Sequence, residues 1–223
     1  MSSLINFLYV YSLGDAENQF RVGKIKTKNM KKLFTILTVV ALTTTVSFAQ
    51  TQFGATVGLN MSNVVGDGES LGMKMGMHIG ASASIPFSDA MSLKTGALYS
   101  MKGASDSEGG ADLTWSLSYI EIPLNLSFAV SDQMSLMAGP YVGILMGANM
   151  KLEVDGTTIL EQDGTDGMAA MDIGINLGAG FAVTDAISIN AGYQMGLTSL
   201  DEEGDGDAKN SNIHIGMTYS FGG

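Results

Sequence analysis

The chain has 223 residues, enough for one ordinary domain, and only 15% of them are charged. Its formal net charge of −11 repels phosphate backbones, so a nucleic-acid partner is excluded on electrostatic grounds. There are 29 glycines, two histidines and no cysteine, and this composition gives no support to a zinc site.

An export signal is predicted near the N-terminus. Met30 and two lysines form a positive n-region, residues 33–48 are apolar, and residues 47–49 (SFA) form a small-x-small cleavage motif. The apolar stretch is slightly short for a membrane anchor and has no stop-transfer flank, which favours cleavage. We therefore divide the chain into an over-long or extended N-terminus (1–29), a signal peptide (30–49) and a mature domain with 20 acidic and 5 basic residues (50–223).

Beyond residue 50 the dominant pattern is the two-residue period of a β-strand. From Leu71 to Phe87 every odd position is apolar, whereas the even positions are Gly, Lys, His, Ser or Pro. The same alternation predicts about eight strands, each long enough to cross a bilayer when tilted. The predicted strands are 53–61, 71–87, 91–102, 113–130, 134–148, 171–181, 187–197 and 213–221.

The predicted strand 113–130 is irregular. Its alternation changes phase near Tyr119 and Ile120, which we interpret as a β-bulge. Pro123 cannot donate a hydrogen bond to a neighbouring strand, and its place four residues after the phase change suggests a local bulge. If the turn at Asp132 is symmetric, Tyr141 lies opposite Pro123 on the polar side of the next strand.

The two faces of the predicted strands differ in size as well as polarity. One face carries Met, Leu, Ile, Phe and Tyr, and the other carries Gly, Ser, Asn and Thr. An eight-stranded barrel has room inside only for its own side chains, so the small polar face is expected to line it. The large apolar face then points outward, which lipid alone tolerates. The sequence predicts an all-β, closed, antiparallel up-and-down transmembrane barrel, too narrow for a diffusion porin.

Short and long connections alternate along the chain. Three short turns are centred on Asp89, Asp132 and Asp185, each next to a Ser or Thr that favours a tight turn. This alternation is typical of an outer-membrane barrel, so we assign the short turns to the periplasm. The long polar segments, predicted as outer loops, are 65–70, 104–112, 153–166 and 201–210.

Acidic residues collect in two of these segments, 153–166 and 201–210. We interpret both as solvated, mobile loops. The alternative is weak binding of divalent cations, structural or bridging to lipopolysaccharide, although the spacing does not match an EF-hand loop. No other cofactor is expected.

Short motifs recur in order along the predicted strands: GLNMS (58–62), YSMKG (99–103), YIEIP (119–123), GPYVG (139–143), YQMGL (193–197) and YSF (219–221). In order and spacing they resemble the PorT-like outer-membrane β-barrel domain of Gram-negative bacteria, often labelled "porin family". The resemblance covers the whole mature chain. It implies an outer-membrane location, contact with the lipid bilayer and lipopolysaccharide, and insertion by the outer-membrane machinery. It implies no single activity.

Charged residues fall on the polar face of neighbouring strands. Glu121 and Lys102 lie at similar heights above the short turns, and a charge in so narrow a lumen must be paired. We predict that they pair inside the barrel, with Lys74, His78 and Asp172 close by. The set is interpreted as a structural plug, and the alternative is a gated proton or ion path.

A catalytic interpretation is also possible. Ser100 or Ser82 with His78 and Glu121 could form the nucleophilic set of a lipid-modifying enzyme. Luminal serine is common because it is small, so no enzyme and no catalytic residue is expected. The sequence favours a monomeric barrel with a structural or binding role in the cell envelope. An accessory role in secretion or transport is the main alternative, and the enzyme is the second.

Overall fold

The computed structural model describes residues 51–66, 69–202 and 208–221. The predicted signal peptide and the segment before it lie outside these residues. Among the described residues, no helix is long and apolar enough to cross a membrane.

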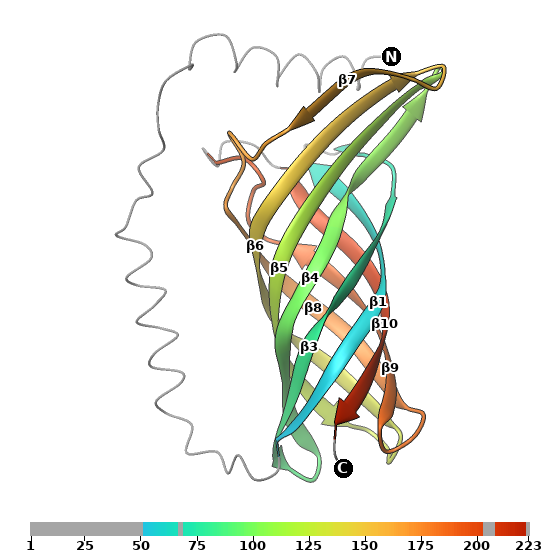
Figure 1. Ribbon diagram of the computed structural model, residues 1–223. Helices are drawn as coiled ribbons and strands as arrows, with labels where there is room; N and C mark the ends of the chain where they lie inside the picture. The colour runs from blue at the N-terminus through green and yellow to red at the C-terminus, as the bar shows by residue number, and fades with distance from the viewer. Residues whose placement is uncertain (1–50, 67–68, 203–207, 222–223) are drawn as a thin grey trace. The chain divides into compact units, whose positions relative to one another are not determined.

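Eight long strands close into an antiparallel ring (Figure 1). The ring closes where β10 pairs with β1, from Phe53 opposite Phe221 to Val65 opposite Lys209. The predicted closed barrel of about eight strands is thereby confirmed. In ring order the strands are β1 (Gln52–Gly66), β3 (Lys74–Ser88), β4 (Met91–Glu108), β5 (Ala111–Ala129), β6 (Met134–Val154), β8 (Met171–Ala182), β9 (Ile187–Gly196) and β10 (Lys209–Phe221). Two short strands, β2 (Glu69–Ser70) and β7 (Thr157–Asp163), pair with β1 and β6.

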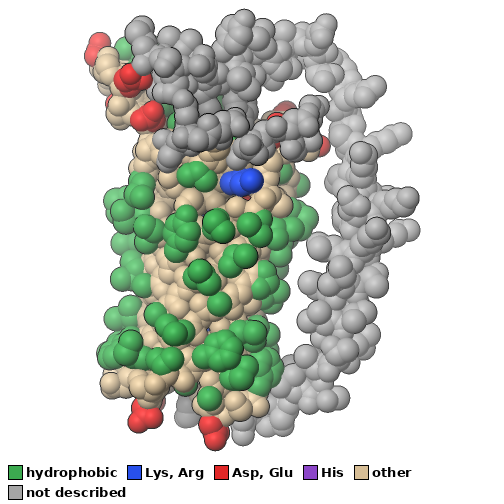
Figure 2. All heavy atoms as spheres, turned by 180° about the vertical axis from the view of Figure 1, so that it is seen from behind, with side chains coloured by type: hydrophobic (Ala, Val, Ile, Leu, Met, Phe, Trp, Pro, Cys, Tyr) green, Lys and Arg blue, Asp and Glu red, His purple; other side chains and the backbone are tan. Residues whose placement is uncertain are grey.

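The polarity of the barrel wall is inverted relative to a soluble protein. Outward side chains such as Phe53, Met75 and Leu136 are 54–69% exposed, whereas the inward Asn60 and Lys102 are 1% exposed. Figure 2 shows hydrophobic side chains over the visible face of the wall and acidic side chains towards its ends. We call these outward apolar side chains of the ring strands the membrane band, because lipid is the solvent that such a surface requires.

Three neighbouring strands continue beyond the rest of the ring and, with β7, form a projecting sheet that we call the extension (residues 104–118 and 147–163). Figure 1 shows it rising at the end of the barrel opposite the C-terminus. Its hairpins turn at Gly109–Gly110, with φ of 62° and 86°, and at Asp155–Gly156, with φ of 50° and 77°. These positive φ values suit two-residue hairpin turns.

The extension corrects two sequence predictions. Residues 104–112 and 153–166 were expected to be long loops, but most of them belong to β4, β5, β6 and β7. Their polar residues form the outer face of paired strands, which the sequence pattern does not distinguish from a loop. In the other two predicted loops, residues 67–68 and 203–207 lie outside the described part of the chain.

The predicted bulge in β5 is wrong in position. Ser118 pairs with Gly147 but Tyr119 pairs with Leu145, so the unpaired residue is Met146 in β6. The inward and outward positions of β5 alternate without interruption, and its register with β4 is constant. Pro123 stays in register opposite Tyr141, as predicted, and no local bulge occurs there.

What changes along β5 is the chemistry of its inward face. Near the short turns this face carries Asn125 and Ser127, and higher up it carries Leu113, Trp115 and Leu117, which are at most 3% exposed. The extension and the rim beside it therefore enclose an apolar cluster that we call the upper core. Its buried members are Val64, Ala104, Leu113, Trp115, Leu117 and Leu200.

The bulge gives the upper part of β6 an apolar inward face that matches the one on β5. Beyond Met146, the residues opposite Leu117, Trp115 and Leu113 are Ala148, Met150 and Leu152. Directly opposed residues on paired strands share a face, so the apolar side of β6 points inward here and outward below the bulge.

Candidate functional site

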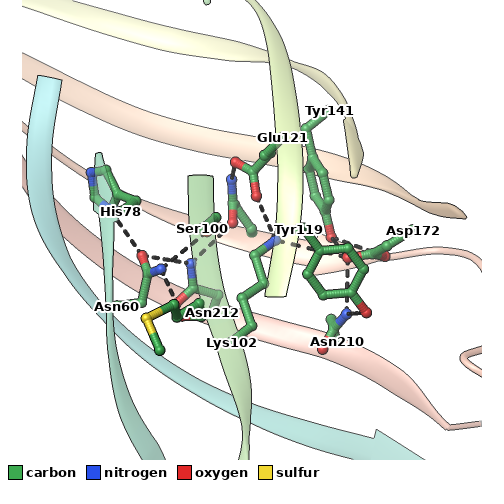
Figure 3. A network of polar contacts seen from close by, with 12 residues as sticks. Asn60, His78, Ser100, Lys102, Tyr119, Glu121, Tyr141, Asp172, Asn210 and Asn212 are labelled. Atoms are coloured by element: carbon green, nitrogen blue, oxygen red, sulfur yellow. Dashed lines mark hydrogen bonds and ion pairs between the residues drawn. The ribbon is translucent and has the colours of Figure 1, made fainter. Parts of the chain in front are cut away.

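A buried ion pair occupies the lumen below the upper core. Lys102 on β4 and Glu121 on β5 project inward, because both fall on the polar phase of their strands. Lys102 Nζ lies 2.7 Å from Glu121 Oε2 and 3.8 Å from Asp172 Oδ2 on β8. All three side chains are at most 4% exposed. One ammonium group thus lies between two carboxylates (Figure 3).

Two tyrosine rings complete the surroundings of this ammonium group. Lys102 Nζ lies 4.3 Å from the ring centroid of Tyr141 and 5.8 Å from that of Tyr119. An aromatic face attracts a cation at such distances, and the attraction is stronger away from water. The rings therefore help to hold a charge that neighbouring water would otherwise solvate.

The second carboxylate has its own donors. Asn210 Nδ2 on β10 donates to Asp172 Oδ2 at 2.9 Å and lies 3.1 Å from Tyr119 Oη. Tyr141 Oη donates to Asp172 Oδ2 at 3.2 Å. Hydrogen bonds to an ionised acceptor are stronger than those between neutral groups. The Asp172 carboxylate is therefore stabilised by Asn210 and Tyr141 as well as by the more distant Lys102.

Amide side chains carry the network across the lumen from Glu121. Gln194 Nε2 on β9 donates to Glu121 Oε1 at 2.6 Å, and Gln194 Oε1 accepts from Asn212 Nδ2 at 3.0 Å. Asn212 Nδ2 also lies 3.3 Å from Asn60 Oδ1 on β1, which is 2.9 Å from His78 Nδ1 on β3. Each of the eight ring strands thus supplies at least one residue. We call the set the cross-lumen network: Asn60, His78, Lys102, Tyr119, Glu121, Tyr141, Asp172, Gln194, Asn210 and Asn212.

The predicted luminal residues divide into three groups. Lys102, Glu121 and Asp172 lie together, and His78 is joined to them only through amide side chains. Lys74 stands apart at the start of β3, and in the described chain it makes no ion pair or hydrogen bond with the others. Sequence reasoning did not select the amides or Tyr119. They could have been found from the sequence because several amide residues lie on the polar faces of different strands, at similar distances from the short turns.

The imagined catalytic set is not assembled. Ser100 Oγ accepts from Asn60 Nδ2 at 3.1 Å, and His78 Nδ1 contacts Asn60. Within the described residues no hydrogen bond joins His78 to Ser82, Ser100 or Glu121, so the nucleophile–base contact of covalent catalysis is missing.

The described parts of the two acidic segments show no assembled metal site. No cluster of three or more His, Asp or Glu side chains suited to a metal ion occurs in the part of the chain that the structure describes. Weak divalent-cation binding at 153–166 and 201–210 stays a prediction.

The three short turns lie at one end of the ring, between β3 and β4, β5 and β6, and β8 and β9. Hydroxyl side chains close two of them: Ser131 Oγ accepts from Met134 N at 3.0 Å, and Thr184 Oγ1 accepts from Ile187 N at 3.0 Å. Asp89, Asp132 and Asp185 lie within these turns. We call this the short-turn end.

Comparison with known proteins gives one family. The sequence profile described as the outer membrane protein beta-barrel domain matches residues 48–202. No curated protein matches the chain.

Solved structures of outer membrane proteins are similar in part. Ail, the attachment invasion locus protein of Yersinia pestis, solved with the heparin analogue sucrose octasulfate, is 16% identical with a TM-score of 0.47. The match covers 77% of this chain and 99% of Ail. Neisserial surface protein A is 12% identical with a TM-score of 0.46, over 76% of this chain and 97% of that one. OprG of Pseudomonas aeruginosa is 13% identical with a TM-score of 0.31, over 78% and 95%.

Proposed function

The chain belongs to the family of outer membrane protein β-barrel domains. We propose that it closes its own lumen and presents the extension as a binding surface for cationic partners. The observation that carries this proposal is the extension itself, a sheet with its own apolar core that projects past the membrane band. A barrel that served only as a membrane anchor would need no such sheet. In this proposal the signal peptide of the chain (30–49) directs export and the short-turn end faces the periplasm. The protein is a monomer without enzymatic activity.

The charge of the extension indicates the kind of partner. Its exposed or half-exposed acidic residues are Asp106, Glu108, Asp112, Glu153, Asp155, Glu161 and Asp163. Its one lysine, Lys151, already pairs with Glu153 at 3.0 Å. A sheet with this excess of carboxylates attracts cationic ligands and repels anionic ones.

The edge of the extension indicates how a protein partner would bind. All seven residues of β7 are exposed, and in the described chain β7 pairs with β6 alone. An exposed strand edge offers a row of backbone donors and acceptors to an incoming strand. A basic, extended segment of a partner protein would combine both attractions.

A peptide-binding measurement tests this proposal. A labelled ten-residue peptide of alternating Lys and Val is titrated with the purified protein in detergent, and the Glu–Val counterpart serves as the negative probe. We expect the double variant Glu161→Lys/Asp163→Lys to bind the basic peptide about tenfold more weakly at low salt. The control Asp89→Lys/Asp132→Lys makes the same charge change at the short-turn end and should bind normally. Equal losses in both variants would refute a specific surface.

The closure of the lumen has a separate test. The cross-lumen network takes side chains from all eight strands, and a barrel of this size leaves no free channel. We expect no ion conductance when the protein is inserted into planar bilayers. Truncating Lys102, Glu121 and Tyr141 together to Ser should produce measurable conductance if these side chains close the lumen. Conductance of the unaltered protein would contradict the proposed closure.

A further inference from the structure

A cavity of about 270 Å³ lies between the cross-lumen network and the short-turn end. Its inner limit is formed by Glu121, Gln194 and Asn212, and it extends to Thr184 and Asp185 in the turn between β8 and β9. The network therefore forms the floor of this cavity, and a solute can reach it from the short-turn end.

An ammonium group projects into the cavity from one wall. Lys94 lies on β4 with its neighbours Ser84 and Asn125 directly opposite on β3 and β5. A Cβ atom built on Gly180 of β8 would lie 3.6 Å from Lys94 Nζ, so the side chain reaches the wall formed by β8. Among the described residues no carboxylate lies within ion-pair distance of Lys94, and Glu121 is engaged by Lys102.

Residues that line the same cavity carry hydrogen-bond acceptors without partners. Asn176 Oδ1, Asn190 Oδ1 and Asn212 Oδ1 are buried and accept no hydrogen bond within the described chain. Asn176 and Asn212 are each only 2% exposed. A buried polar atom left without a partner is costly, and in native proteins it usually meets water or a ligand.

The orientation of Asn176 and Asn212 is fixed by their other atoms, whereas the Thr218 hydroxyl bonded to Asn190 can either donate or accept. Asn176 Nδ2 donates to Asn125 Oδ1 at 3.0 Å, and Asn190 Nδ2 donates to Thr218 Oγ1 at 3.2 Å. Asn212 Nδ2 donates to Gln194 Oε1. Exchanging oxygen for nitrogen in Asn176 would set two oxygen acceptors against each other. The same exchange in Asn212 would set its oxygen against Gln194 Oε1, because Gln194 Nε2 is held by Glu121. The free atoms of these two amides are therefore oxygens that need donors.

We propose that this cavity is a binding site for a small anion that also carries hydrogen-bond donors. The anionic oxygens of the ligand pair with Lys94, and its donors satisfy the free oxygens of Asn176 and Asn212, whose side chains turn towards the cavity to meet them. Two kinds of molecule share this chemistry: hydroxylated acids, whose donors are hydroxyl groups, and amino acids, whose donor is an ammonium group. Asp185 near the entrance favours the second kind. The proposal is independent of the function assigned to the extension.

Calorimetric titration of the purified protein in detergent at neutral pH tests the chemistry of the ligand. The probes are gluconate, which carries hydroxyl donors, glycine, which carries an ammonium donor, and acetate, which carries neither. We expect saturable binding of gluconate or glycine at least about tenfold tighter than that of acetate, because acetate leaves the buried oxygens unpaired. The tighter of the two identifies the donor. If neither binds more tightly than acetate, the proposal is wrong.

Substitution of the lysine tests the location. Lys94→Met keeps the length of the side chain without its charge and should weaken binding of the better probe at least about tenfold. Lys151→Met, in the extension, is the matched control and should bind as the unaltered protein does. Unchanged binding by Lys94→Met would overturn the assignment.

A measurement on the unaltered protein covers the case in which Lys94→Met fails to fold. In protein labelled with ¹⁵N-lysine, the Nζ signal of Lys94 should shift on addition of the better probe, whereas that of Lys151 should not. A Lys94 signal unmoved at saturation would overturn the proposal without any variant.

Discussion

The two ends of β6 show opposite polarity within one continuous strand. Near the short-turn end, Leu136 points outward and is 54% exposed, whereas Tyr141 points inward and is fully buried. Beyond the bulge at Met146 the apolar Met150 and Leu152 share the inward face. The membrane band and the upper core are thus built from the same residue types on opposite faces. What differs is the surrounding solvent, lipid in one case and water in the other.

The neighbouring strand reaches the same result in another way. Along β5, Leu126 and Phe128 point outward and are 41–42% exposed, whereas Leu113 and Trp115 point inward and are 3% exposed. No residue is inserted, and the sequence itself changes the phase of its apolar positions. The apolar side of a strand can therefore change from outward to inward in two ways. In β6 an extra residue causes the change, and in β5 the apolar residues move to the other phase of the alternation.

Insertion of one Ala directly after Met146 should have the largest effect on this contrast. Because the bulge takes up only one extra residue, the upper part of β6 shifts by one position against β5, which turns Met150 and Leu152 outward and Asn149 and Lys151 inward. We expect the extension to lose its packing, at a cost of more than about 4 kcal/mol. Limited proteolysis should cut the extension. The rest of the barrel should still migrate differently on an SDS gel before and after boiling, which shows that it stays folded. An uncut extension would show that the bulge does not control the faces.

Lys102→Met should destabilise the barrel by about 3–5 kcal/mol, because it leaves two buried carboxylates without their cation. The measurement is the free energy of unfolding in guanidinium chloride for protein folded into lipid vesicles. The triple variant Lys102→Met/Glu121→Gln/Asp172→Asn removes all three charges and should recover much of the loss. If the single and triple variants were equally unstable, the loss would reflect packing rather than charge.

The same substitution on the outer face of each region compares their solvents directly. Ile215→Lys, at the middle of β10, places a charge in the membrane band and should cost about 2–4 kcal/mol, the range for the bilayer midplane. Ser116→Lys lies on the outer face of the extension and should change the free energy of unfolding by less than about 0.5 kcal/mol. Both values come from the same vesicle experiment, and similar losses would place the extension in lipid as well.

The alternation of residues predicts the barrel because each strand has one large apolar face and one small polar face. It also predicts local relations, such as Pro123 opposite Tyr141, since these depend only on a symmetric turn. The inward positions of Lys102 and Glu121 follow from the same reasoning on two adjacent strands.

Other features depend on more than one strand at a time. A phase change in β5 does not reveal that the extra residue belongs to its partner, because both arrangements fit the sequence of β5 alone. The contact of Gln194 with Glu121 joins strands that are not neighbours, and it depends on the diameter and stagger of the closed ring. The extension was missed because the outer face of a water-exposed strand has the composition of a loop.

The cross-lumen network also limits when its own contacts can form during assembly of the barrel. Its amides come from the first and last strands as well as the middle: Asn60 lies on β1, and Asn210 and Asn212 lie on β10. Asn212 and Asn60 can meet only when these two strands pair, so the network stays incomplete in every partly zipped sheet. Sealing the seam and burying the polar interior are consequently a single event. The polar interior is therefore complete only in the closed barrel.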